Sequence, residues 1–292
     1  MNLQQHIAAN KRNTALIMAA FVGIVGAIGW VIANLFGNVS MTYGIIGISL
    51  IYVVIQYFMA DKLALMSTGA KQITQTDNSR LWGMVQKISA QANLPMPKVY
   101  IIQDSAPNAF ATGRDPRHAV VAATTGIMDI MDDRELNAVL AHELSHVKNY
   151  DIRISMIAFG LVSIIGALTN MLQWTFMFGG GNSDDRDSSP GSMIIGIVLI
   201  VLAPIAAMMI QMAISRQREY LADASGADMI HDNEGLASAL EKLLQFGKPM
   251  KRQDTSTAHL FISNPLRVGS FVQLFSTHPP LESRIERLRE AM

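Results

Sequence analysis

The chain carries two histidines, His142 and His146, that lie four positions apart and enclose a glutamate in the pattern H-E-x-x-H. In a helix this spacing places both imidazole rings on one face, one turn apart, where they can bind a single metal ion. Two neutral imidazoles and a carboxylate suit zinc, which then keeps a fourth position for water. Glu143 follows His142 directly and can take a proton from that water without binding the metal. The pattern therefore predicts a hydrolytic zinc site, with one ion per chain, if a helix carries it.

A capped helix is predicted over residues 134–149, which include the motif. Asp132 or Asp133 can cap its N-terminus, and Glu135 is placed for the return hydrogen bond of a capping box. The alternative is a solvated helix face that carries two histidines by chance. Apolar residues at helical spacing beside the motif favour a packed helix and therefore the zinc site.

A catalytic zinc site needs a third protein ligand, for which Glu219 is the candidate. His146 lies seven residues before Arg153, after which a charge-free run begins, and Glu219 lies four residues after Ser215, where another such run ends. If these runs form an antiparallel pair of membrane helices, both ligands lie about 6–12 Å from the bilayer edge, at a rise of about 1.5 Å per residue. The hairpin then brings Glu219 level with the histidine pair.

Asp223 lies one turn beyond Glu219 on the same helix face. Its carboxylate can accept a hydrogen bond from the outer nitrogen of a ligand histidine, as is usual around metal sites. The alternative is a solvated turn in which both carboxylates pair with Arg216 and Arg218. The H-E-x-x-H helix favours the ligand interpretation, because only a carboxylate or a histidine can complete the site in a chain without cysteine.

Four apolar segments must hold these elements in place. Residues 13–60 contain no charged residue and no histidine, and a turn-like stretch at 37–40 divides them. Two further charge-free runs flank a short acidic loop at 181–191. Each segment is near the length of about 20 residues that crosses the hydrocarbon as a helix. The four segments are residues 14–36, 41–59, 154–183 and 188–215.

These segments have alternative interpretations. The first could be a cleaved signal peptide, but it is too long, and a second apolar segment follows almost at once. The last two contain polar residues and a proline, so a buried soluble hairpin or a re-entrant pair is the alternative to full spans. Two hairpins of membrane helices are the simplest interpretation.

Positively charged residues predict the orientation. Lys and Arg flank the outer ends of both predicted hairpins, whereas the connecting loops are uncharged or net acidic. Because Lys and Arg concentrate on the cytoplasmic side, both termini and both polar stretches are expected in the cytoplasm. The predicted fold is a predominantly α membrane protein, with four transmembrane helices in two hairpins and a cytoplasmic α+β catalytic domain. Its parts are an N-terminal hairpin at 1–60, catalytic residues at 61–153, a second hairpin at 154–215 and further catalytic residues at 216–292.

Composition restricts the class of protein. The 292 residues are 50% hydrophobic and only 16% charged, with a mean hydropathy of +0.26. Such a composition excludes a disordered chain. The 23 Lys and Arg balance the 23 Asp and Glu, which argues against a nucleic-acid partner. The absence of cysteine excludes disulfides and a cysteine nucleophile. A lipid bilayer is therefore the expected environment, and a transition-metal site must use His, Asp and Glu.

The polar stretches contain further elements. Residues 247–280 are long and irregular, and form a candidate flap over a site. An exposed edge strand at Asn108, Ala109 and Phe110 could pair with the backbone of an extended substrate without demanding a sequence. A purely structural strand is the alternative. The predicted elements are helices at 80–92, 234–246 and 281–291, a strand at 99–102, and a hairpin of strands at 108–112 and 118–124.

The sequence H-E-L-S-H at 142–146, followed after two apolar segments by E-Y-L-A-D at 219–223, resembles the HtpX-type membrane zinc endopeptidases. These are gluzincin proteases related to the CAAX prenyl proteases. The similarity extends to the N-terminal hairpin, to N-A-F-A-T-G at 108–113 and to T-H-P-P at 277–280, so it covers essentially the whole chain. The resemblance implies a zincin-like domain in which His142, His146 and Glu219 are ligands, Glu143 is the base and Asp223 supports a ligand.

The resemblance also implies a multi-pass metalloendopeptidase of the bacterial plasma or inner membrane. Such an enzyme serves protein quality control and cuts misfolded or damaged membrane proteins on the cytoplasmic side. His278 is the candidate hydrogen-bond donor to the oxyanion, with Arg284 fixing or assisting it. A structural histidine before a Pro-Pro turn is the alternative, and His259 is the rival donor. A CAAX-type processing protease, a non-catalytic scaffold stabilised by zinc and a transporter are the other functions to consider.

Overall fold

The computed structural model of the protein describes residues 40–157, 216–253, 257–266 and 279–291. Near the N-terminus it describes residues 5, 8–10, 12–19, 22–23, 26 and 30, all of them helical. The third and fourth predicted membrane segments lie outside the described residues, except for residues 154–157, which are helical. The division into two hairpins and a split catalytic domain therefore stays a prediction.

A four-stranded sheet has the strand order β1-β2-β4-β3. Strands β2 and β4 are parallel, whereas β3 and β4 are antiparallel, with Ala109 opposite Ala123. The predicted hairpin is thus confirmed. Gly113 turns the chain after β3 with φ of +135°, and a Cβ built there would lie 2.4 Å from the carbonyl oxygen of His118, so only glycine fits. The strands are β1 (Lys71–Gln72), β2 (Lys98–Ile102), β3 (Ala109–Thr112) and β4 (Val120–Thr124).

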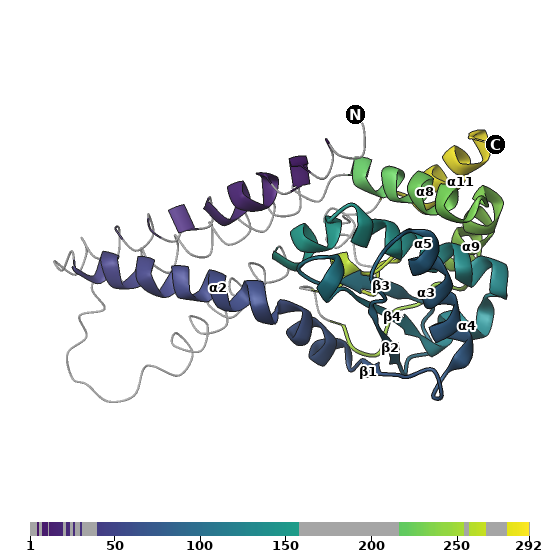
Figure 1. Ribbon diagram of the computed structural model, residues 1–292, viewed down its shortest axis with the longest axis horizontal. Helices are drawn as coiled ribbons and strands as arrows, with labels where there is room; N and C mark the ends of the chain where they lie inside the picture. Colours follow the sequence, from purple (N-terminus) through teal and green to yellow (C-terminus); the bar gives the residue numbers. More distant parts are fainter. Residues whose placement is uncertain are drawn as a thin grey trace, which may run out of the picture.

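Helix α5 (Asp133–Lys148) lies at the centre of the compact part and contacts α3, α8, α9 and the edge strand β3 (Figure 1). The helices predicted at 80–92, 134–149, 234–246 and 281–291 are all present, within one or two residues at each end. The short helix α4 was not predicted. The other helices of the compact part are α3 (Ser79–Gln91), α4 (Thr125–Ile130), α8 (Arg216–Ile230), α9 (Asn233–Phe246) and α11 (Leu281–Glu290).

The main apolar core joins the two polar stretches of the chain. Leu140 and Leu144 of α5 are fully buried, and they belong to the same cluster as Leu240 of α9 and Ile285 of α11. Residues before and after the second apolar region are therefore packed into one core. Burial of a leucine-sized side chain contributes about 1.5–3 kcal/mol, so this shared core fixes α8, α9 and α11 against α5.

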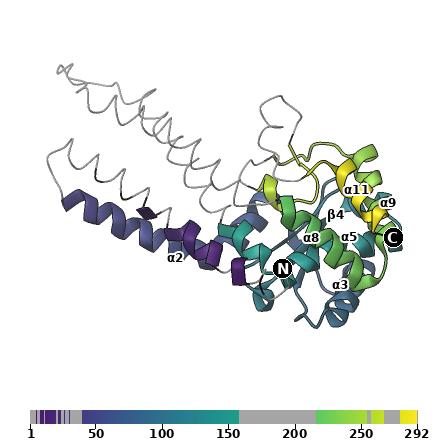
Figure 2. The ribbon, with the colours of Figure 1, turned by 90° about the horizontal axis from the view of Figure 1, so that it is seen from above.

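Helix α2 (Ser40–Thr68) projects from the compact part, and the described helical residues near the N-terminus lie beside it in both ribbon views (Figures 1 and 2). The predicted apolar segment ends at Met59, and the helix continues beyond it through Asp61 and Lys62 to Thr68. Composition shows where the apolar stretch ends but not where the helix ends, because both charged residues are compatible with a helix. The last turns of α2 pack through Ala64 and Leu65 into a second apolar cluster with Phe110 of β3.

Among the helices of the described ranges, none alone is long and apolar enough to cross a membrane. Within α2, the stretches Ile46–Met59 and Asp61–Thr68 meet at an angle of 65°. Taken together, these two stretches have the length and the apolar composition of a membrane span.

Candidate active site

The N-terminus of α5 is fixed by the predicted capping box. The Asp132 carboxylate accepts a hydrogen bond from the backbone N–H of Glu135 at 2.9 Å, and the Glu135 carboxylate accepts one from the backbone N–H of Asp132 at 3.0 Å. Glu135 also accepts from Ser238 at 2.7 Å and from Lys242 at 2.5 Å, both on α9. Burial alone would raise the pKa of Glu135, but these hydrogen bonds hold it below its usual value. The helix that carries the H-E-x-x-H motif is therefore anchored at its first turn.

Helix α8 approaches α5 very closely at the motif. A Cβ built at Gly226 would lie 2.8 Å from both the N and the Cα of His142, so a larger residue would force the helices apart. The hydroxyl of Ser145 lies 2.7 Å from the carbonyl oxygen of His142 and 3.1 Å from that of Ala222 on α8. This close contact brings the first turns of α8, with Glu219 and Asp223, to the histidines.

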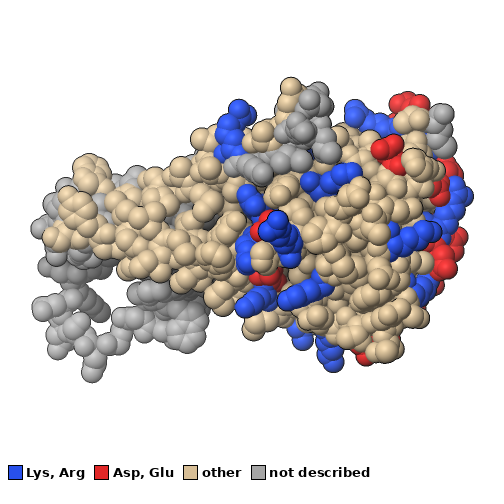
Figure 3. All heavy atoms as spheres, viewed as in Figure 1, with Lys and Arg blue, Asp and Glu red and all other residues tan. Residues whose placement is uncertain are grey.

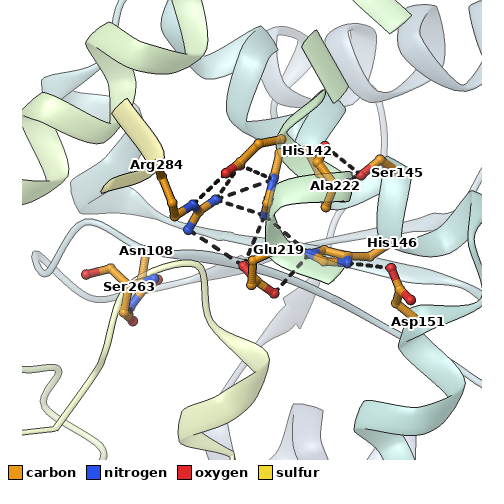
Figure 4. A network of polar contacts seen from close by, with 10 residues as sticks. Asn108, His142, Ser145, His146, Asp151, Glu219, Ala222, Ser263 and Arg284 are labelled. Atoms are coloured by element: carbon orange, nitrogen blue, oxygen red, sulfur yellow. Dashed lines mark hydrogen bonds and ion pairs between the residues drawn. The ribbon is translucent and has the colours of Figure 1, made fainter. Parts of the chain in front are cut away.

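The structure brings His142, His146 and Glu219 together (Figure 4). The Nε2 atoms of the two histidines are 3.2 Å apart. The Glu219 oxygens lie 3.9 Å from Nε2 of His142 and 3.7 Å from Nε2 of His146. Tetrahedral ligands at the usual zinc distances lie about 3.3 Å from one another. The three side chains thus have the spacing of a zinc site, while their role as ligands stays a prediction.

Each histidine also faces a carboxylate through its other ring nitrogen. Nδ1 of His142 lies 3.0 Å from Asp223, the residue expected to support a ligand, and Nδ1 of His146 lies 3.0 Å from Asp151. A carboxylate accepts, so each Nδ1 carries a hydrogen and each Nε2 can offer its lone pair to a metal ion. Two Nε2 atoms that lie 3.2 Å apart, with Glu219 beside them, can bind one cation. The tautomers therefore fit a metal ion.

Arg284 lies behind Asp223, on α11. Its guanidinium donates two hydrogen bonds to Asp223, at 2.9 and 2.6 Å, and Nη1 lies 3.6 Å from Glu219. The arginine is completely buried. Burial raises the pKa of Asp223, but the charge of Arg284 outweighs it and holds this pKa at about 2. Arg284, expected to assist His278, thus contacts the carboxylate that holds His142; His278 itself lies outside the described residues.

Glu143 is buried beside the histidines. Its burial raises the pKa of the carboxyl, against the opposing charges of His142 and His146 and a hydrogen bond from the backbone N–H of Ala111. For His146 burial lowers the pKa, but Asp151 and the charges of Glu219 and Glu143 raise it to about 9. The field at the centre of the site is therefore strongly negative, as a cation requires.

A small pocket opens beside these groups. The imidazole of the rival donor His259 lines this pocket, and its Nε2 lies 2.9 Å from the carbonyl oxygen of Ser155. Arg218, which the sequence suggested only as an ion-pair partner on a solvated turn, also lines this pocket, and its burial lowers the pKa of its guanidinium. The ranking of His278 above His259 stays a prediction. The pocket is lined by Ala111, Glu143, His146, Asp151, Ile152, Ser155, Arg218, Glu219, His259 and Leu260.

The predicted substrate strand lies at the edge of the sheet, and its outer side is paired within the chain. The N–H of Ile262 donates to the carbonyl oxygen of Ala109 at 3.0 Å, and Phe110 forms an antiparallel bridge with Phe261. Asn108 donates to the carbonyl oxygen of Ser263 at 2.8 Å. Part of the irregular region expected to act as a flap thus occupies the edge beside the site.

Sequence reasoning missed several residues of the site. Asp151 lies just after the predicted helix end, and nothing in the spacing marks it as a partner of His146. Asn10, which contacts Asp151, lies far away in the sequence. Gly226 gave a usable signal, because an isolated glycine in a helical stretch often marks a close approach of backbones.

Comparison with known proteins agrees with this geometry. The family model for Peptidase family M48 matches residues 75–292. The chain is 49% identical to a "Protease HtpX homolog" of Tropheryma whipplei (strain Twist), over 97% of both chains. It is 44% identical to one of Ligilactobacillus salivarius, over 98% of this chain and 99% of the relative.

A solved structure shares the fold. The crystal structure of S. mikatae Ste24p has a TM-score of 0.52 and 17% sequence identity, over 97% of this chain and 66% of that chain. The family model alone covers most of the sequence, including both halves of the histidine and glutamate cluster. The chain therefore belongs to peptidase family M48, and it is a metallopeptidase.

Proposed function

We propose that the protein is a membrane-bound zinc endopeptidase of bacterial protein quality control. The observation that carries this proposal is the convergence of the His142 and His146 Nε2 atoms on Glu219, with Glu143 beside them. The ligands are His142, His146 and Glu219, and they hold one zinc ion. When bound, zinc would polarise the scissile carbonyl and lower the pKa of its water, so that hydroxide would be available as the nucleophile at neutral pH.

Glu143 acts as the general base. It takes a proton from the attacking water and passes it to the nitrogen of the leaving amine. Its raised pKa, caused by burial, suits this role, because a base that must also return the proton works best when its pKa approaches the working pH. His278 or His259 donates a hydrogen bond to the oxyanion. Arg284 holds Asp223 against His142, and its Nη2 also lies 3.3 Å from Nε2 of His142.

The substrate binds in an extended conformation along the outer edge of β3. Main-chain pairing recognises any extended chain, which suits an enzyme that removes misfolded or damaged proteins. Support comes from the bridge between Phe110 and Phe261, because this edge already accepts an antiparallel backbone segment. The segment 260–262 must leave before a substrate can take its place.

The bilayer surrounds α2 and the other apolar segments. Large apolar side chains of α2 are strongly exposed, among them Tyr43 at 75% and Ile51 at 62%. An apolar surface of this size is typical of contact with a membrane or a partner. On the face in Figure 3 the described part of the projecting arm carries no Lys, Arg, Asp or Glu, and cationic side chains, with acidic atoms among them, gather where it meets the compact part. This distribution supports a cytoplasmic catalytic domain.

The decisive experiment replaces Glu143 by Gln in the full-length protein, purified in detergent. We expect zinc content to be unchanged and cleavage of a casein-type substrate to fall by at least about 100-fold, because general-base catalysis contributes about 10²–10⁴-fold. A chelator should abolish the activity of the wild type, and zinc should restore it. Retained cleavage in Glu143→Gln would contradict this mechanism, whereas a zinc-loaded wild type that cleaves no substrate would favour a scaffold whose zinc is structural.

A further inference from the structure

We propose that Asp151 is a positioning residue for the metal site, and that Asn10 of the N-terminal helical segment holds it in place. This inference rests on the proposed function, because it takes His146 to be a metal ligand. It assigns a contribution to the active site, made through Asp151, to the N-terminal segment, which is the part expected to anchor the protein in the membrane.

Asp151 determines which nitrogen of His146 faces the metal. Its Oδ2 lies 3.0 Å from Nδ1 of His146, on the side of the ring away from Glu219 (Figure 4). Nδ1 therefore carries the hydrogen, and the lone pair of Nε2 is directed towards Glu219, 3.7 Å away. Asp151 is only 4% exposed, so water does not compete effectively for this hydrogen bond. The carboxylate thus fixes both the tautomer and the plane of the ring.

A sharp turn brings Asp151 back to the histidine. Helix α5 is closed by Asn149, and Tyr150 then adopts φ of +61°, a conformation that is unfavourable for a bulky side chain. The next helical stretch, residues 151–157, starts immediately with Asp151. Strained residues of this kind persist where the surrounding structure holds them and are frequent at functional sites. Here the strained residue sets the direction from which the carboxylate meets His146.

Asn10 holds this turn from a distant part of the chain. Its Nδ2 donates one hydrogen bond to Oδ1 of Asp151 at 2.7 Å and one to the carbonyl oxygen of Asn149 at 2.9 Å. The amide thus uses both of its hydrogens on the two residues that flank Tyr150. Asn10 is 7% exposed, so this contact is shielded from water.

The two histidines are therefore supported in parallel. Asp223 faces His142 and is held by Arg284 near the C-terminus, whereas Asp151 faces His146 and is held by Asn10 near the N-terminus. Residues that orient metal ligands usually affect metal affinity by about 10–100-fold. We expect Asp151 to act in this range, and Asn10 to act more weakly because it works through Asp151.

The test measures metal affinity rather than activity. The Asp151 and Asn10 variants are made in full-length Glu143→Gln protein, so that no variant can cleave itself. Zinc affinity is measured by competition with a chromophoric chelator, and the visible spectrum of bound Co²⁺ reports the ligand geometry. We expect Asp151→Ala to lower zinc affinity by about 10–100-fold and to change the Co²⁺ spectrum. Asp151→Asn keeps an acceptor for Nδ1–H and should restore part of the affinity.

Asn10→Ala should lower zinc affinity by about tenfold or less. Thr14→Val is the matched control: it removes the hydroxyl that donates to the carbonyl oxygen of Asn10 at 2.8 Å and leaves the Asn10 amide intact. This control should bind zinc like its parent. Thermal unfolding in the presence of a chelator shows which variants fold; if Asp151→Ala does not, Asp151→Asn and Asn10→Ala carry the test.

An affinity equal to that of the Glu143→Gln parent and an unchanged Co²⁺ spectrum in folded Asp151→Ala would overturn the inference. If Asp151→Ala does not fold, the same result in both Asp151→Asn and Asn10→Ala would overturn it. His142→Ala separates this failure from that of the proposed function. If His142→Ala loses zinc while the Asp151 and Asn10 variants keep it, the proposed ligand set remains supported and only the positioning role is wrong. If His142→Ala keeps zinc, the ligand set itself is wrong, and the inference fails with it.

Discussion

At the scale of single residues, the site is a set of charges that balance only as a group. Asp223, Glu219 and Glu143 are all buried, and so is Arg284, which is bonded to the first and close to the second. A buried charge without its partner costs several kcal/mol. We therefore expect the ionic network to contribute to folding as well as to metal binding, and the next experiment tests its contribution to folding.

We predict that Arg284→Met lowers the free energy of unfolding by about 3–5 kcal/mol, because Asp223 is left as an uncompensated buried charge. Thermal or chemical unfolding of the full chain in detergent measures this loss. The matched control is Arg287→Met on the same helix. Arg287 is exposed and stacks on the ring of Tyr220 at 3.9 Å; its loss should cost about 1 kcal/mol or less. If both substitutions lowered the free energy of unfolding equally, the buried pair of Arg284 and Asp223 would contribute no more to stability than an exposed arginine does.

The residues that were predictable are those with local signals. The capping box at Asp132 and Glu135 is a local pattern within four consecutive residues, so it could be predicted from the sequence, and the structure confirms it. Asp151 was not predictable, because its contact with His146 depends on a left-handed conformation at Tyr150 that no propensity of tyrosine indicates. Asn10 was not predictable for another reason. Its partner Asp151 lies 141 positions away, and a single sequence does not indicate a contact over such a separation.

At the scale of elements, the long helices and the hairpin follow from periodicity, caps and turn residues. Strand β1 has only two residues and helix α4 only six, too few for a periodic pattern. The sequence predicted the end of the second apolar segment at Met59 but not the helical turns of α2 that follow it, because charged residues carry no signal for where a helix ends. The close approach of α8 to α5 is a matter of packing, and the next prediction tests it.

We predict that Gly226→Ala separates α8 from α5, since the new methyl group would meet the backbone of His142 at 2.8 Å and backbone cannot rotate away. Overpacking of this kind costs about 1–3 kcal/mol, and Glu219 and Asp223 would move with α8. Zinc affinity should therefore fall together with stability. Gly83→Ala on α3 is the control: nothing lies within 4 Å of its added Cβ, so stability should stay equal or rise by up to about 1 kcal/mol. A neutral Gly226→Ala would contradict the packing argument.

The segment that pairs with β3 gives a second prediction for an element. Ile262→Pro removes the N–H that donates to Ala109 and should free the edge for substrate. We expect a lower KM for an extended peptide, with kcat little changed. Ile262→Ala removes a similar amount of buried side chain and keeps the N–H, so it controls for lost packing. If both variants raise KM alike, the segment helps to bind substrate rather than blocking its place.

At the scale of the whole molecule, the site collects residues that lie far apart in the sequence. Asn10 comes from the N-terminal segment, His146 from α5, Glu219 from α8 and Arg284 from α11. Such a site exists only when the apolar segments and the compact part are assembled together. The orientation of the assembly in the bilayer therefore decides on which side the enzyme meets its substrates.

The chain contains no cysteine, so single cysteines can report this orientation without background labelling. We predict that Asp185→Cys, in the acidic loop, reacts with a membrane-impermeant maleimide applied outside intact cells, because net acidic loops face away from the cytoplasm. Lys87→Cys, on the exposed face of α3, should react only after the membrane is permeabilised. Each serves as the other's control for expression and accessibility. Labelling of Lys87→Cys from outside, with Asp185→Cys protected, would place the site on the opposite side and exclude cytoplasmic proteins as its substrates.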